Sequence, residues 1–198
     1  MSPRTAFIAG TVAFLVGAAG LAAAVLHISA SGGGQTATQA SSVGGPFRLV
    51  DQDGRAVTEA DLKGKATLVF FGFTRCPDIC PTALYEISQA FAAMGPDAAK
   101  AQALFVTVDP ERDTPDALKR YLSSFSPQIR GLTGTLEAVQ AMTKEYRAYA
   151  KKAPTKDGDY TMDHTAIVYL MDRNGAFVAP LNVKRSPEEI AAEIRRYG

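Results

Sequence analysis

Cysteine and histidine each occur only twice in this chain of 198 residues, and tryptophan is absent. Two cysteines cannot build a scaffold of several disulfides, so a folded domain here must depend on a core of its own. Neither sign of charge dominates, since 21 basic residues stand against 20 acidic ones and the formal net charge is +1. That balance argues against nucleic acid or another charged polymer as a partner.

Charge is missing altogether from residues 6–26, which are mostly apolar. A membrane-spanning helix needs about 20 such residues, whereas the apolar core of a secretory signal is roughly 7–15 residues long. The length favours an uncleaved anchor over residues 1–28, with cleavage near the small residues at 29–31 as the alternative. Because Arg4 precedes the apolar run, we predict a cytoplasmic N-terminus in the inner membrane and a folded domain in the periplasm, or in the equivalent intermembrane space.

The segment after this anchor, residues 29–45, consists of small and polar residues and is typical of a flexible tether. Residues 46–198 open with a hairpin signal and then alternate short apolar runs with stretches of helical periodicity. We predict strands at 66–73, 103–109 and 164–172, and helices at 82–94, 114–125, 135–150 and from 186 onward. This order predicts an α/β fold in which helices sandwich a mixed sheet.

Both cysteines lie in the segment FTRCPDICP, where Cys76 and Cys80 follow the first predicted buried strand. A proline comes after each of them, so we expect a turn at 76–80 and a regular helix from about Pro81. On a helix, a spacing of four positions puts the Cβ atoms about 5–6 Å apart, against about 3.8 Å in a disulfide. A small local adjustment therefore converts the pair between a closed bridge and two thiolates that share one metal ion.

The spacing leaves three uses of this pair open: a structural disulfide, a redox couple and part of a metal site. A bridge across so short a loop removes little conformational entropy from the unfolded chain. A domain of this size also has a core and needs no such bridge. Reactivity is therefore the favoured interpretation over a purely structural disulfide.

His164 is the one histidine of the predicted domain, since His27 lies at the end of the apolar run. We expect His164 to begin the strand at 164–172, directly after a polar loop. Two thiolates and an imidazole form a soft set of ligands that suits Cu(I) or zinc. Structural zinc usually takes four ligands, whereas three ligands with an open side suit copper that must be released again. Met162 offers a thioether nearby, or packs against the loop.

These segments resemble the SCO/SenC family of copper chaperones for cytochrome c oxidase. FTRCPDICP matches the cysteine motif of the family, VDPERDTP at 108–115 its second signature, and DYTMDHTAIVYLMD at 159–172 its histidine region. Three motifs in the same order across residues 46–198 make the resemblance specific. It implies a thioredoxin-like fold for this domain.

The resemblance also implies a function. Cys76, Cys80 and His164 would bind copper, as Cu(I) or Cu(II), and pass it to the binuclear copper centre in subunit II of cytochrome c oxidase. A thioredoxin-like reductant would first open a disulfide between the two cysteines, and another periplasmic copper chaperone is a candidate source of the ion. Three residues are candidates to lie beside the ligands: Asp78, Met162 and Asp163.

Two rival functions use the same cysteines without a metal: a membrane-anchored thiol–disulfide oxidoreductase and a thiol peroxidase. The usual redox motif has two residues between its cysteines rather than three. Peroxiredoxins carry a threonine three residues before the reactive cysteine, whereas Thr74 lies two before Cys76. We therefore expect a metallochaperone with no catalytic residue. In the second signature we expect Asp109 and Asp113 to orient the loop.

Overall fold

The computed structural model describes residues 43–198. The predicted anchor at 1–28, and the tether up to residue 42, lie outside the described residues, so both remain predictions. Across residues 43–198 no helix has the length and apolar character needed to cross a membrane. The last residues of the predicted tether already contact the domain, because the Gly44 N–H donates to the carbonyl of Glu145 at 2.9 Å.

Strands and helices alternate along the described chain, as the sequence predicts. Their bounds are β1 Arg48–Asp51, β2 Ala56–Thr58, η1 Glu59–Leu62, β3 Ala66–Gly72, α2 Ile79–Met94, η2 Gly95–Lys100, β4 Ala101–Thr107, α3 Pro115–Leu122, β5 Ile129–Thr133, α4 Leu136–Glu145, β6 Ala150–Pro154, β7 Tyr160–His164, β8 Val168–Met171, β9 Phe177–Leu181 and α5 Pro187–Arg195.

A seven-stranded sheet of order β2-β1-β5-β4-β3-β8-β9 forms the centre of the domain. It is mixed, since β3 runs parallel to β4 and antiparallel to β8. Every residue of β3 and β4 is buried. This is the pattern of strands covered on both faces, and it explains the unbroken apolar runs in the sequence.

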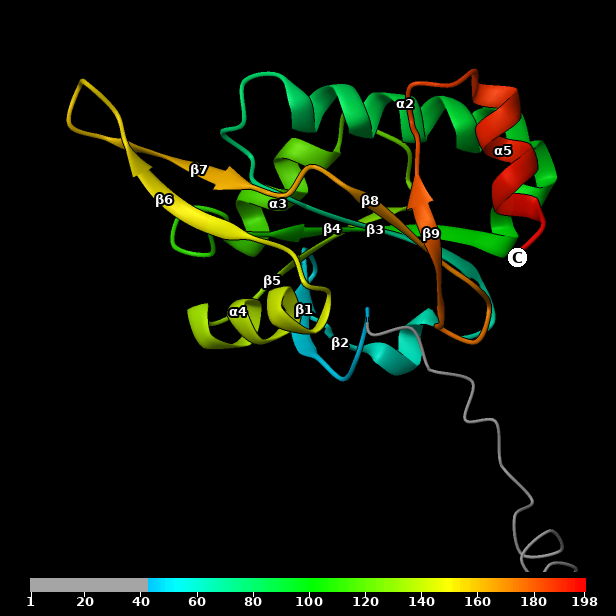
Figure 1. Cartoon of the computed structure of the whole chain (residues 1–198), viewed down its shortest axis with the longest axis horizontal. Coiled ribbons are helices and arrows are strands. Elements are labelled where there is room, and N and C mark those ends of the chain that lie inside the picture. Colours follow the sequence, from blue (N-terminus) through cyan, green and yellow to red (C-terminus); the bar gives the residue numbers. More distant parts are fainter. Residues whose placement is uncertain (1–42) are drawn as a thin grey trace, which may run out of the picture. The chain divides into compact units, whose positions relative to one another are not determined.

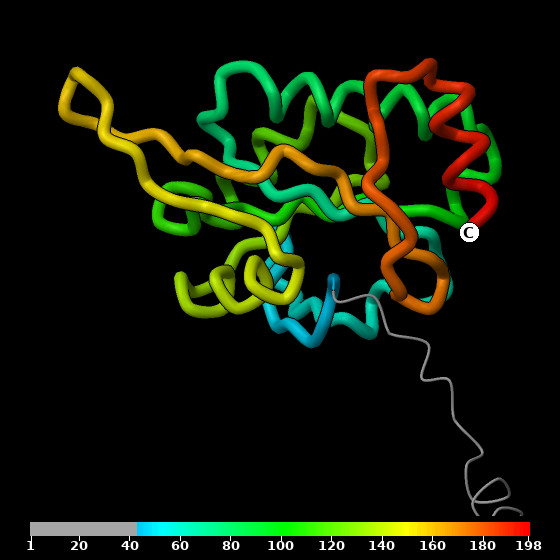
Figure 2. The backbone as a smooth tube through the Cα atoms, in the orientation of Figure 1, coloured from blue at the N-terminus to red at the C-terminus, as the bar shows by residue number. Residues whose placement is uncertain are grey.

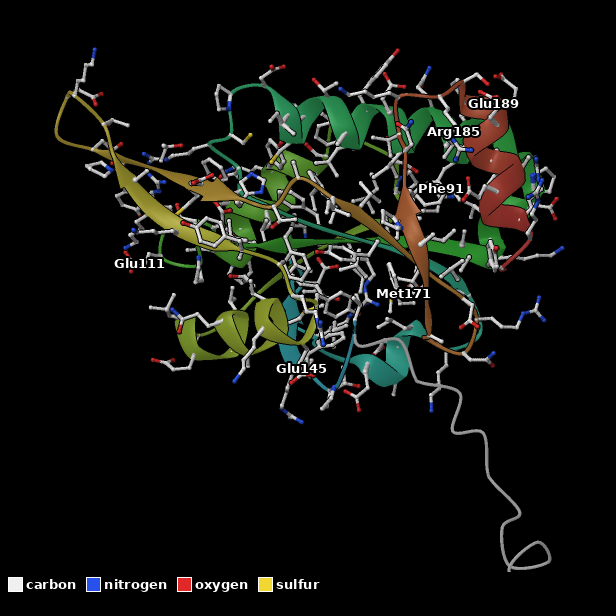
Figure 3. The ribbon with its side chains drawn as sticks, viewed as in Figure 1. Phe91, Glu111, Glu145, Met171, Arg185 and Glu189 are labelled. Carbon is white, nitrogen blue, oxygen red and sulfur yellow. The ribbon has the colours of Figure 1, made fainter. Side chains whose placement is uncertain are left out.

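Helices α2, α3 and α5 cover one face of this sheet, and α4 with η1 covers the other (Figure 1). Each face has its own core cluster. Phe91 of α2 belongs to the first cluster and Met171 of β8 to the second, and the two residues lie on opposite sides of the sheet in Figure 3. The α/β class with a helix-covered mixed sheet is therefore confirmed.

Two predicted helix starts are confirmed by their capping contacts. The Thr114 side chain accepts a hydrogen bond from the Ala117 N–H ahead of α3. Ser186 and Glu189 form a full capping box ahead of α5. Helix α2, in contrast, begins at Ile79, two residues before the expected start. A proline is tolerated in the first turn because the N–H groups there have no partner within the helix.

The segment after α4 differs most from the prediction. The helix ends at Glu145 rather than near residue 150, because the chain leaves it with Arg147 at φ +51. The polar stretch that follows is a hairpin of β6 and β7, which form a separate two-stranded sheet. His164 therefore ends β7 instead of beginning a strand, and the predicted strand at 164–172 is divided between β7 and β8.

Candidate metal centre

Sheet topology brings the two halves of the centre together. β8 pairs antiparallel with β3, and Val168 at the start of β8 lies opposite Phe70 near the end of β3. The chain just before β8 and the chain just after β3 therefore meet at one edge of the sheet. The first carries His164 and the second carries both cysteines, which are separated from the histidine by about eighty positions.

The ligand atoms of Cys76, Cys80 and His164 all lie within 4.8 Å of one another. Cys80 Sγ is 3.7 Å from His164 Nε2, and Cys76 Sγ accepts a hydrogen bond from the Cys80 N–H at 3.4 Å. Both cysteines are free thiols. Cys80 is fully buried, while Cys76 and His164 are half-buried, so the cluster is closed on one side and accessible on the other.

The imidazole of His164 is held by contacts on two sides. Its Nδ1 lies 3.1 Å from the carbonyl oxygen of Thr165. Because a carbonyl oxygen only accepts, Nδ1 carries the proton, and in the neutral ring Nε2 keeps its lone pair for the thiols or a metal. The buried ring of Phe73 meets the imidazole edge to face, with centroids 5.6 Å apart. The histidine is thus oriented as a ligand before any ion binds.

Burial raises the pKa of the Cys80 thiol, and the neighbouring Cys76 and Asp113 raise it further. The hydrogen bond with the Phe73 backbone opposes this shift and is outweighed. Without a metal, Cys80 therefore stays protonated at neutral pH. A bound ion must displace that proton, so metal uptake releases protons.

Gly72, the last residue of β3, gives Cys80 its room. A Cβ atom at this position would lie 2.7 Å from Cys80 Sγ and 2.6 Å from the ring of Phe105. Real Cβ atoms do not approach other atoms so closely, and the neighbours on both sides are buried. The glycine is needed here for the close approach of strand and thiol.

Gly72→Ala is therefore expected to destabilise the domain by about 1–3 kcal/mol, the usual range for overpacking a filled core. Chemical denaturation of the variant and the wild type measures this difference. Gly45→Ala is the matched control, because its Cβ would meet only the side chain of Glu145, which is exposed and can move aside. Equal stability of Gly72→Ala and the wild type would contradict the packing described here.

The second signature ties the cysteine loop to the rest of the domain through Asp113. The carboxylate of this fully buried residue accepts hydrogen bonds from the Thr74 N–H at 3.0 Å, the Thr74 hydroxyl at 2.6 Å and the Thr107 hydroxyl at 2.7 Å. Burial raises the pKa of Asp113, and these hydrogen bonds offset part of the shift. These contacts are the ones expected of a residue that orients the cysteine loop.

The same loop reaches the histidine hairpin through Asp109. The Tyr160 hydroxyl donates to Asp109 Oδ1 at 2.9 Å, and Arg112 pairs with the same carboxylate. The sequence predicted a role for Asp109 but not for Tyr160 or Arg112. Both lie within the quoted motifs, yet nothing in the spacing shows that they touch.

The three residues predicted beside the ligands occupy different surroundings. Asp78 is the exposed N-cap residue of α2 and makes no capping hydrogen bond with its side chain. Met162 shares the His164 face of β7 and packs against the second core cluster. Asp163 lies on the opposite face of β7 and is exposed. An influence of these three side chains on a bound ion therefore stays a prediction.

The geometry suits a small soft ion. Metal–sulfur bonds of about 2.3 Å and metal–nitrogen bonds of about 2.0 Å reach a shared centre from atoms at these separations. Two thiolates and one imidazole favour copper or zinc over magnesium or calcium. Cysteine, histidine, aspartate and glutamate are the side chains that most often bind metal ions. Among the described residues, Cys76, Cys80 and His164 form the one group of three or more of them whose ligand atoms lie close enough to share an ion.

Comparisons with known proteins agree with this arrangement. Residues 35–198 match the family model described as SCO1/SenC. A bovine protein (Bos taurus) named "Protein SCO2 homolog, mitochondrial" is 40% identical over 196 residues, which cover 94% of this chain and 73% of the bovine protein.

Two solved structures are also similar. ScoI from Bradyrhizobium japonicum with copper bound is 61% identical, with a TM-score of 0.76 over 78% of this chain and 99% of that one. Yeast Sco1 with copper bound is 40% identical, with a TM-score of 0.71 over 78% of this chain and 87% of that one. Both of those proteins hold copper.

Proposed function

Because this chain belongs to the SCO1/SenC family, we propose that it is a copper chaperone for cytochrome c oxidase, with Cys76, Cys80 and His164 as the copper ligands. The observation that carries the proposal is the convergence of two thiol sulfurs and one imidazole nitrogen within 4.8 Å. Copper is the cargo of this protein, so the site must release the ion as well as bind it.

The partial exposure of the site supports release. Cys80 is fully buried, whereas Cys76 and His164 are half-buried. Ligands of an acceptor protein can approach from that side and replace the exposed ligands one at a time. A three-ligand site also leaves a coordination position at which an incoming ligand binds before an outgoing one leaves.

The proposed binding cycle includes a redox step. When the two thiols close into a disulfide, they lose two electrons and two protons to an oxidant, and the sulfurs no longer bind copper. A thioredoxin-like dithiol would reverse this by supplying two electrons and two protons while forming its own disulfide. Reduction would thus make the site receptive to copper.

The proposed acceptor is the binuclear copper centre of subunit II of the oxidase, and another periplasmic copper chaperone is the proposed source. We place the domain in the periplasm, or in the intermembrane space, tethered to the inner membrane by residues 1–28 with the N-terminus in the cytoplasm. The apolar run at 6–26 supports this placement.

An oxidoreductase without a metal is less well supported. Cys80 is fully buried, and burial raises the pKa of its thiol, so Cys80 is poorly suited to act as an attacking thiolate. His164 Nε2 lies 3.7 Å from that thiol. This position suits a third metal ligand, whereas thiol–disulfide exchange between two cysteines does not require an imidazole.

Transfer of copper tests the proposal. The full chain, purified in detergent, reduced and loaded with Cu(I), is mixed with oxidase subunit II stripped of copper. We expect the chaperone to lose its Cu(I) and the acceptor to gain copper. The absorption of the binuclear centre should appear after a one-electron oxidant such as ferricyanide is added, because a centre filled with two Cu(I) ions is colourless. Copper that stays on the donor, or rapid peroxide turnover by the chain, would contradict the proposal.

A further inference from the structure

The hairpin of β6 and β7 carries His164 but is not part of the main sheet. Its strands pair with each other, from Ala150 opposite His164 to Pro154 opposite Tyr160, and with no strand of the seven-stranded sheet. It projects away from the rest of the domain (Figure 2). The backbone ladder of the main sheet therefore does not fix the position of the histidine.

Side chains of the loop between β4 and α3 attach this hairpin instead. Tyr160 lies at the far end of β7 from His164, and its hydroxyl donates to Asp109 Oδ1 at 2.9 Å. Arg112 donates from Nη1 to the Tyr160 carbonyl at 2.9 Å, and its guanidinium lies 3.7 Å from the centroid of the tyrosine ring. We call Asp109, Arg112 and Tyr160 the tyrosine clamp.

The clamp is more than a surface contact. Asp109 is 1% exposed, and the side chain of Arg112 is 13% exposed, so both charges are largely removed from water. The buried carboxylate receives donors from both partners, which satisfies it. Hydrogen bonds to a buried charge are among the stronger ones, and losing a partner leaves that charge unsatisfied.

Contacts outside the clamp also hold this hairpin, since Met162 of β7 and Ala150 of β6 pack against the second core cluster. Lys152 of β6 lies 4.5 Å from the centroid of the Tyr160 ring and pairs with Glu111 at 2.7 Å. Glu111 lies on the loop after β4, next to the hairpin (Figure 3). Both partners of this ion pair are exposed, so it contributes little by itself.

One loop thus touches both halves of the copper site. Asp113 holds the cysteine loop at Thr74, and Asp109 and Arg112 hold the hairpin at Tyr160. Because side chains alternate along a strand, Tyr160 and His164 share a face of β7, about 13 Å apart at a rise of about 3.3 Å per residue. Because this short strand is rigid, a displacement of Tyr160 also displaces His164.

We propose that Tyr160 is a positioning residue: the tyrosine clamp fixes β7 so that His164 Nε2 stays within ligand distance of the two thiols. This inference rests on the proposed copper binding. Without the clamp, the two cysteines would still bind copper, while the imidazole would join them only part of the time.

Tyr160→Phe in the full chain, purified in detergent, removes the hydroxyl and keeps the ring. We expect the affinity for Cu(II) to fall about tenfold, in line with other residues that support a metal ligand. The nitrogen coupling in the electron paramagnetic resonance spectrum of the Cu(II) complex should broaden. Hydrogen exchange of the β7 amides should quicken already in the copper-free chain.

Tyr149→Phe is the matched control, since this tyrosine lies next to the hairpin with its side chain about half exposed and is not part of the clamp. It should leave affinity, spectrum and exchange unchanged. Arg112→Lys keeps the positive charge but loses the planar guanidinium group, which contacts both Asp109 and the Tyr160 carbonyl. It should therefore reproduce the Tyr160→Phe effects.

The decisive comparison is made in a His164→Ala background. If Tyr160 acts through His164, adding Tyr160→Phe to that variant changes copper affinity no further. Equal losses in both backgrounds would show a general structural role and overturn the inference, as would wild-type affinity and exchange in Tyr160→Phe. A wild-type chain that binds no copper would overturn the proposed function itself, while the exchange rates of β7 would still test the clamp.

Discussion

Replacing both Cys76 and Cys80 by alanine is expected to lower the affinity for Cu(I) by about 10,000-fold. Structural zinc sites with four ligands gain roughly 10–16 kcal/mol on binding, which is roughly 3 kcal/mol for each ligand. Two such ligands correspond to about 6 kcal/mol, or a factor of about 10,000. Anaerobic competition of the full chain with a Cu(I) chelator measures this loss.

The oxidised wild type provides a comparison with an unchanged sequence. With Cys76 and Cys80 closed into a disulfide, it should bind Cu(I) as weakly as the double variant, and reduction should restore full affinity. Single alanine variants should lie between these limits. Retention of Cu(I) affinity within about tenfold of the wild type in the double variant would show that the ion binds elsewhere.

His164→Ala is expected to weaken Cu(II) binding by about 100-fold, and Cu(I) binding by less. Cu(I) is soft and is held well by two thiolates, whereas imidazole nitrogen contributes more to the binding of Cu(II). Titration of the full chain with each ion gives the two affinities. The absorption and paramagnetic resonance spectra of the Cu(II) complex should change at the same time.

The chain supplies its own control for this substitution, because His27 is the other histidine in the sequence. His27→Ala removes the other imidazole of the chain and leaves Cys76, Cys80 and His164 in place, so both affinities should stay at wild-type values. Loss of affinity in His27→Ala equal to that in His164→Ala would contradict the assignment of the third ligand.

Much of the fold follows from the sequence because its signals are local. The apolar run of β3, the face of α2 that carries Leu84, Ile87 and Phe91, and the cap at Ser186 depend on neighbours in the chain. The thioredoxin-like mixed sheet agrees with these signals and with the resemblance to the SCO/SenC family, which the family match confirms.

Strands β5, β6 and β7 carry no such local signal. β5, Ile129–Thr133, includes Arg130 and Gly131 and was not predicted, because its stability comes from pairing with β1 and β4. β6 begins at the residue where the predicted helix of 135–150 was expected to end, and its lysines give no strand pattern. Contacts from distant residues, Glu111 and Arg112 among them, hold this hairpin in place.

The candidate ligands could be selected from the sequence because the choice was small: two cysteines, and one histidine within the domain. Their convergence could not be derived from spacing, since it depends on the antiparallel pairing of β8 with β3. The contacts that hold the His164 side chain could not be predicted from the sequence either. Its hydrogen bond to Thr165 and its contact with Phe73 emerge only from the fold.

X-ray absorption of the reduced full chain, loaded anaerobically with one equivalent of Cu(I), tests the central claim most directly. The geometry of Cys76, Cys80 and His164 predicts one retained copper per chain, with two sulfur neighbours at about 2.3 Å and one nitrogen neighbour at about 2.0 Å. A chain that retains no copper, or a copper ion without sulfur neighbours, would contradict the account.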